Sequence, residues 1–198
     1  PEGVDYASTS VRSPDHSGRR VRLIGLAPRM PHMSGKRILL VMRHSKSSWK
    51  TNEPDIRRPL SGRGTRDAVV AGQTLVTYAP DVVWCSSAAR AVQTWQCAQL
   101  GGAASPDVRL SDDLYGATAS ELLATLRTTP ASADTTLLIT HEPGASELIS
   151  SLAVSSPLLA EVEARFPTSA IAVLSHDRDW DELAPGSCTL LAFEIPRG

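Results

Sequence analysis

The chain has 198 residues, 41% of them hydrophobic, and a formal net charge of −1 at pH 7, which fits one globular domain. This balance lacks the basic surplus that binds nucleic acid or an anionic membrane, so we expect neither partner. Three cysteines without paired metal-ligand spacing, and no apolar run of the roughly 20 residues that a membrane helix needs, favour a cytoplasmic protein.

Residues 1–35 are rich in Pro, Ser, Gly and Arg and follow neither a helical nor a strand period. Such a segment cannot bury enough apolar surface to fold, so we predict a disordered N-terminal extension and a domain over residues 36–198. Met33 stands just before the first strand-like run. The extension can therefore be a genuine tail or an over-extended gene start.

Short continuous apolar runs occupy residues 37–42, 82–85 and 136–140. Runs of this kind are typical of strands buried on both faces, which predicts a parallel sheet. Between them, small and apolar residues from Ala68 to Ala79 recur with the helical period, and Thr118 with Glu121 forms a capping box before a leucine-rich helix. The pattern predicts an α/β fold in which helices cover the sheet.

The last part of the chain follows a different pattern. Residues 169–174 and 188–195 are strand-like, and the segment between them is polar, with three aspartates, a proline and a glycine but no helical period. This arrangement predicts a C-terminal antiparallel hairpin.

Four polar residues follow the three buried runs: Arg43 and His44 after the first, Arg90 after the second and His141 after the third. Ligands of open parallel sheets bind beyond the carboxyl ends of the strands, so these side chains are the first candidates for a site. Arg90 is expected in the first turn of a helix capped by Ser87, where the macrodipole disfavours a cation by roughly 0.3–1 kcal/mol. A bound anion would reverse that preference.

Taken singly, a histidine is usually structural and an arginine usually solvated, but their shared placement favours a site. Guanidinium groups match phosphate oxygens and repel cations, so the set suits phosphate better than a metal ion. Cys85 precedes Arg90 by too few residues for a Cys-x5-Arg phosphate loop, and the loop lacks glycines. We therefore interpret Cys85 as a buried strand cysteine.

These motifs together resemble the histidine phosphatase superfamily, and within it the SixA-like phosphohistidine phosphatases. Five segments carry the resemblance, in the order of that family: residues 41–44, 58–64, 86–94, 140–144 and 168–171. It implies a three-layer α/β/α sandwich with a mostly parallel sheet, like that of phosphoglycerate mutases. Ser45 departs from it, because many members have glycine there.

The resemblance further implies a phosphatase without metal or cofactor, in which His44 becomes phosphorylated while Arg43, Arg90 and His141 hold the phosphoryl oxygens. The proton-donating carboxylate is not obvious. Asp113 is a tentative acid, and the competing interpretation is a solvated loop residue.

Protein phosphohistidine is the expected substrate, because a protonated imidazole leaves without a strong acid. A small phosphorylated metabolite, cleaved by a phosphomonoesterase of the same superfamily, is the alternative. A non-catalytic module that binds a phospholigand is a third. Residues 45–58 are where a lid over the pocket would lie, and a lid would favour the metabolite.

Overall fold

The computed structural model describes residues 35–198. The disorder predicted for residues 1–35 therefore concerns residues outside the described range, except for Gly35. Within that range six strands form one sheet: β1 (Arg37–Arg43), β2 (Val82–Ser86), β3 (Asp107–Ser111), β4 (Thr135–Thr140), β5 (Ile171–His176) and β6 (Thr189–Glu194). The same range holds five α-helices: α1 (Gly62–Tyr78), α2 (Ala89–Leu100), α3 (Ala119–Leu126), α4 (Gly144–Leu152) and α5 (Pro157–Ala164). Short 3-10 turns form η1 (Asp55–Arg57), η2 (Asp112–Leu114) and η3 (Trp180–Glu182).

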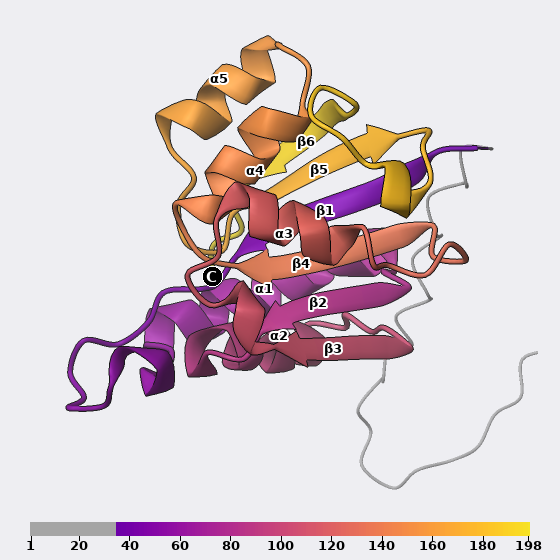
Figure 1. The fold of residues 1–198 in the computed structure, drawn as a ribbon. Helices are drawn as coiled ribbons and strands as arrows, with labels where there is room; N and C mark the ends of the chain where they lie inside the picture. Colours follow the sequence, from indigo (N-terminus) through magenta and orange to yellow (C-terminus); the bar gives the residue numbers. More distant parts are fainter. Residues whose placement is uncertain (1–34) are drawn as a thin grey trace, which may run out of the picture.

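The strands lie in the order β3-β2-β4-β1-β5-β6 (Figure 1). β1 pairs with β4, β4 with β2 and β2 with β3 in parallel, whereas β5 runs antiparallel to both β1 and β6. The mostly parallel sheet and the C-terminal antiparallel hairpin are thereby confirmed. The carboxyl ends of β1, β2 and β4 consequently meet at one edge of the sheet, as ligand sites of such sheets require.

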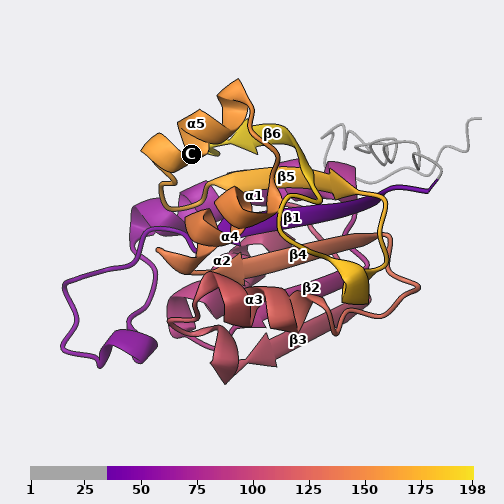
Figure 2. The ribbon, with the colours of Figure 1, turned by 45° about the horizontal axis from the view of Figure 1, so that its top comes forward.

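Helices cover both faces of the sheet, which confirms the three-layer architecture (Figures 1 and 2). Residues of α1 and α2 share one apolar core with the sheet, and residues of α3, α4 and α5 share the other. Strands covered on both sides must be apolar on both sides, which explains the uninterrupted runs of β1 and β4. None of the described helices is long and apolar enough to cross a membrane.

Local capping agrees with the sequence at one helix and differs at another. The capping box of Thr118 and Glu121 is present at the start of α3. At α2 the predicted cap is wrong: Ala88, not Ser87, is the N-cap residue, and the hydroxyl of Ser86 accepts from the Ala88 N–H at 3.3 Å. Ser87 instead binds the carboxylate of Asp112. Arg90 still lies in the first turn of α2.

The segment between β1 and α1 projects beyond the carboxyl edge of the sheet and returns to it (Figure 2). Two contacts fasten its ends together: the backbone N–H and the hydroxyl of Ser61 both donate to the carbonyl of Lys46, at 2.8 and 2.9 Å. Gly64, in the first turn of α1, packs directly against the same peptide. A Cβ added to Gly64 would lie 2.1 Å from the Lys46 carbonyl oxygen.

We therefore expect Gly64→Ala to destabilise the protein, because backbone cannot move aside as a flexible side chain can. Overpacking of this kind typically lowers the free energy of unfolding by about 1–3 kcal/mol. Gly62→Ala is the matched control in the same turn, since a Cβ there meets no atom closer than 4.0 Å. Thermal and urea unfolding of both variants check this; equal stability of the two would contradict the close contact.

Candidate active site

His44 follows the end of β1 and is buried, with 7% of its surface exposed. Its Nδ1 lies 2.7 Å from the carbonyl oxygen of Ser45. A carbonyl can only accept, so Nδ1 carries the proton of the neutral ring and Nε2 keeps its lone pair. Nε2 faces Arg90, whose Nε donates to it at 3.2 Å. The geometry thus presents an unprotonated nitrogen beside a guanidinium group.

Ser45 is held from two sides, which fixes the carbonyl that orients His44. The backbone N–H of Ser45 donates to the Thr94 hydroxyl at 2.9 Å, and its own hydroxyl accepts from Ser169 at 2.7 Å. Thr94 in turn donates to the carbonyl of Arg90 at 2.6 Å. The departure from glycine at this position therefore adds a side chain that ties β1 to the turn before β5.

His141 follows β4 and lies against His44, with ring centroids 4.9 Å apart. Its Nε2 is 2.8 Å from the hydroxyl of Ser86, at the end of β2. That hydroxyl accepts from the Ala88 N–H and can also donate to His141, in which case Nδ1 of His141 carries the proton. In either tautomer the buried Nδ1 has no hydrogen-bond partner among the described residues.

The arginines around the two rings also keep buried donors without partners. Nε of Arg43 and both Nε and Nη1 of Arg58 are buried and unbonded within residues 35–198, although Nη1 of Arg43 donates to the carbonyl of Phe166 at 2.8 Å. Buried donors are nearly always satisfied. The charges of Arg43 and His141 both act on His44, so their unpartnered nitrogens mark a place for the oxygens of an anion, whereas the Arg58 guanidinium lies over the Trp49 ring, 3.5 Å from its centroid.

Asp55, in η1, is the carboxylate that the structure brings to this cluster. Its side chain pairs with Arg90 at 3.0 Å and Arg58 at 2.9 Å, and accepts from the Tyr115 hydroxyl at 2.8 Å. Its carbonyl accepts from Nη1 of Arg90 at 2.7 Å. The Tyr115 hydrogen bond, with Arg90 and Arg58, holds the pKa of Asp55 below its usual range.

The four residues singled out from the sequence thus share one region, but Asp113 does not join them. Asp113 is exposed, and its contacts are with the hydroxyl of Ser111. Asp55, Arg58, Ser86 and Tyr115 were missed. A signal for two of them exists in the sequence: Asp55 and Arg58 are an acid and a base three residues apart, directly before Pro59-Leu60.

Cys85 is fully buried in β2. Burial raises the pKa of its thiol to about 12. The thiol is therefore protonated at neutral pH and unsuited to nucleophilic attack. This agrees with the interpretation of Cys85 as a buried strand cysteine.

Burial and neighbouring positive charge keep both histidines neutral. Burial lowers the pKa of His44 to about 3, and the nearby His141 ring, Arg90 and Arg43 contribute to the lowering. The hydrogen bond to Ser45 acts in the opposite direction and raises this pKa. Burial and then Arg90 lower the pKa of His141 to about 4. A neutral imidazole at His44 is the form that can attack phosphorus.

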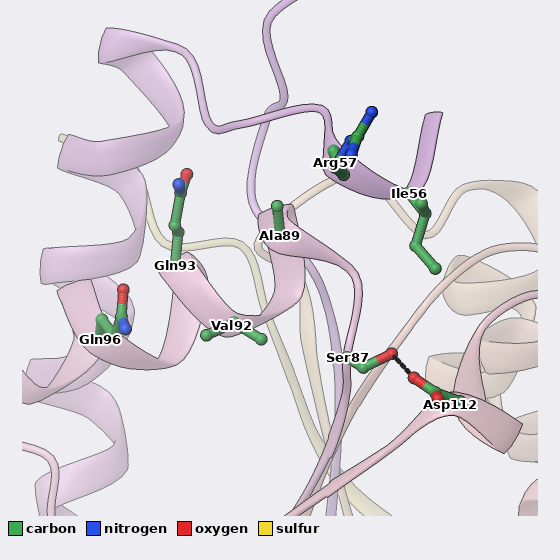
Figure 3. A pocket seen from close by; sticks show the side chains of 8 residues that line it. All are labelled: Ile56, Arg57, Ser87, Ala89, Val92, Gln93, Gln96 and Asp112. Carbon is green, nitrogen blue, oxygen red and sulfur yellow. Dashed lines mark hydrogen bonds between the residues drawn. The ribbon is translucent and has the colours of Figure 1, made fainter. Parts of the chain in front are cut away.

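A hollow of about 480 Å³ borders the cluster on the side of β2 and β3 (Figure 3). Ile56 and Arg57 of η1 form one wall, the first turns of α2 form another, and the Ser87–Asp112 hydrogen bond lies at one end. The segment 45–58 therefore contributes a wall beside the site and, through Asp55, a partner for its arginines. Residues 35–198 contain no group of three or more His, Cys, Asp or Glu side chains arranged to hold a metal ion.

Comparison with known proteins decides the family. Residues 39–179 match the family model of the histidine phosphatase superfamily, branch 1. The chain belongs to this superfamily of phosphatases. An uncharacterised protein of Mycobacterium tuberculosis is 35% identical over 162 residues, which are 79% of this chain and 100% of the relative.

Two solved structures extend the comparison within the superfamily. One, from Nakamurella multipartitia, is provisionally described as the phosphohistidine phosphatase SixA; it is 34% identical, with a TM-score of 0.75 over 82% of this chain and 98% of that one. The other, from Agrobacterium tumefaciens and described in the same terms, is 26% identical, with a TM-score of 0.67 over 81% and 99% of the two chains.

The lowered pKa values of the two histidines make a direct pH prediction. Because the folded pKa of His44 lies near 3 and that of His141 near 4, both rings stay neutral as the pH falls through the ordinary value of about 6.5. The ring nitrogens observed by ¹⁵N NMR between pH 7.5 and 4.5 report this directly. A protonation midpoint near 6.5 for His44 would contradict the described surroundings.

Replacing Asp55 by asparagine tests its competition with anions. The substitution removes a negative charge and an ion pair that an incoming phosphate must displace from Arg90, so we expect Asp55→Asn to bind inorganic phosphate more tightly. Since the Asp55 side chain is 50% exposed, such a pair is worth about 0.2–1 kcal/mol, so the gain in affinity is about 1.4-fold to fivefold.

Calorimetric titration with phosphate measures the affinity, with Asp113→Asn as the control for loss of an exposed acid whose hydrogen bonds are with Ser111. Weaker binding by Asp55→Asn than by the wild type would show instead that Asp55 positions Arg90 for the anion.

Proposed function

We propose that this phosphatase removes the phosphoryl group from phosphohistidine on a protein, through a covalent phosphohistidine formed on His44. One observation carries the proposal: a buried, neutral imidazole, whose Nε2 lone pair accepts from Arg90, lies beside buried groups on Arg43 and His141 that have no partner among the described residues. These donors need hydrogen-bond acceptors. The three oxygens of a phosphoryl group are acceptors of the right kind.

In the first step the Nε2 lone pair of His44 attacks phosphorus in line, and the bond from phosphorus to the substrate imidazole breaks. Arg43, Arg90 and His141 hold the equatorial oxygens, while Arg58 pairs with Asp55. Arg90 must then exchange the Asp55 carboxylate and His44 Nε2 for phosphate. In the second step water attacks phosphorus, phosphate leaves and His44 is restored.

The acidic residues near the pocket favour a leaving group that does not need a proton from a general acid. Asp55 has a lowered pKa and bonds two arginines and a tyrosine, so it holds a proton poorly. Asp113 has no contact with the cluster. A protonated substrate imidazole leaves without a general acid, whereas an alkoxide does not. Protein phosphohistidine suits this site better than an ester.

The phosphohistidine phosphatase descriptions of the Nakamurella and Agrobacterium proteins support the same substrate. Retention of all four predicted phosphate-binding residues supports an enzyme over a non-catalytic binding module.

Glu142 supports a second candidate function, hydrolysis of a small phosphomonoester. It adjoins His141 in the chain, and burial raises the pKa of its carboxyl group. One oxygen accepts from the Ser146 hydroxyl at 2.6 Å, while Oε1 is buried without a partner among the described residues. A raised pKa is what a general acid for an ester oxygen needs, and Glu142 is thus an alternative to Asp113 for that role.

The two functions are separated by substrate preference. We expect the wild type, with EDTA present, to release phosphate from a phosphohistidine-bearing carrier protein at a higher kcat/KM than from para-nitrophenyl phosphate. His44→Ala removes the nucleophile and should abolish turnover of both. His176→Ala is the control, because His176 lies at the opposite end of the sheet, where it pairs with Arg37.

Higher kcat/KM on the ester, reduced by Glu142→Gln on the order of 10²-fold or more, would favour the phosphomonoesterase. Loss of activity in EDTA would contradict the metal-free mechanism. No phosphate release from either substrate by the wild type would favour the binding module.

A further inference from the structure

A second hollow, of about 400 Å³, opens at the ends of β1 and β5, on the other side of His44 from α2. Arg43 and Glu142 form its inner wall, next in the chain to His44 and His141. The remaining walls come from the loop after β1, the start of α1 and the residues between α5 and β5. Arg43 takes part in the phosphoryl-transfer steps described above and Glu142 in the second candidate function, but those steps use none of the other residues that line this hollow.

Positive charge is concentrated in this hollow. Arg43, Lys46, Arg63 and Arg165 line it, against the single carboxylate of Glu142. Arg63 bonds the buried Asp67 at 3.3 Å, but the exposed side chains of Lys46 and Arg165 form no ion pair within residues 35–198. Burial lowers the pKa of the neighbouring Arg197. The charge of Asp67 raises this pKa, whereas the charges of Arg63 and Arg165 lower it. The cations therefore repel one another, and an anion would relieve that repulsion.

Arg43 connects the hollow to the nucleophile. Its Nη1 donates to the carbonyl of Phe166 in the hollow wall at 2.8 Å, its Nε is buried without a partner among the described residues, and it immediately precedes His44. The hollow therefore begins at the residue next to the nucleophile, and Lys46 and Arg165 line the same hollow.

We propose that this hollow is a subsite for an acidic side chain that the substrate protein carries close to its phosphohistidine. The proposal rests on the proposed function and adds the sequence context that the enzyme selects. Lys46 and Arg165 are exposed on two separate elements, so a carboxylate on another protein's surface can reach them. The hollow on the opposite side of His44 is lined mainly by uncharged side chains, and its two charged residues, Arg57 and Asp112, are of opposite sign (Figure 3). The acidic residue is therefore expected on one side of the phosphohistidine and a neutral residue on the other.

Charge reversal tests the subsite in the full-length protein. Two phosphohistidine peptides are compared, identical except that one carries Glu and the other Gln at the flanking positions. The measured quantity is the ratio of kcat/KM for the acidic peptide to that for the neutral one, in the wild type, Lys46→Glu and Arg165→Glu. The Lys46 backbone keeps its contacts with Ser61 in the variant, because the side chain takes no part in them.

Lys36→Glu and Arg178→Glu are the matched controls. Both side chains are exposed, and both lie at the opposite end of the sheet, where the start of β1 meets the end of β5. Each makes the same change of charge as the corresponding test variant, so a general effect of net charge on the acidic peptide would show in them equally.

We expect the wild type to prefer the acidic peptide, and each test variant to lower the ratio by about threefold to tenfold, as loss and reversal of partly exposed ion pairs imply. The controls should stay within about twofold of the wild-type ratio. Equal ratios in the wild type and test variants, or equal losses in the controls, would overturn the subsite while leaving the proposed function intact. Failure of the wild type to cleave either peptide would overturn the proposed function and the subsite with it.

Discussion

The site depends on one hydrogen bond, from Nδ1 of His44 to the carbonyl of Ser45. It fixes the tautomer that leaves Nε2 unprotonated, and it points the ring at the place where the parallel strands end. Thr94 and Ser169 hold Ser45 in turn, so the orientation of one ring draws on β1, α2 and the turn before β5. Without a fixed tautomer the same ring could direct an N–H bond at phosphorus and could not attack it.

The positive surroundings of His44 serve two purposes. Arg90 and Arg43 disfavour a further charge on the ring, which together with burial keeps its pKa near 3, and the same guanidinium groups attract the phosphoryl group. Cations gathered in a buried site need counter-charge. Asp55 supplies part of it in the described state through Arg90 and Arg58. Phosphate binding is then an exchange of one anion for another, which lowers the net electrostatic gain but keeps the arginines ordered between turnovers.

The sequence predicted the parallel part of the sheet and the four phosphate-binding candidates because both follow from local pattern. Strands covered on two faces are apolar runs, and Arg43, His44, Arg90 and His141 come directly after such runs. β3 was missed because it is an edge strand with alternating exposure, and its charged Asp107 and Arg109 interrupt any apolar run.

Tertiary contacts account for what the sequence did not predict in the site. Asp55 and Tyr115 are 60 positions apart and meet only when the loop after β1 folds back. The predicted Ser87 cap was wrong because Asp112, on a neighbouring element, binds the Ser87 hydroxyl, a partner that local sequence does not reveal.

The proposed mechanism requires that His44 itself becomes phosphorylated. The most direct measurement is rapid mixing of the enzyme with ³²P-labelled phosphohistidine carrier, an alkaline quench that preserves phosphohistidine, and peptide mapping of the label. We expect label on the peptide that contains His44, appearing before free phosphate and absent in His44→Ala. Multiple turnovers without label on that peptide, or label on His141 instead, would contradict it.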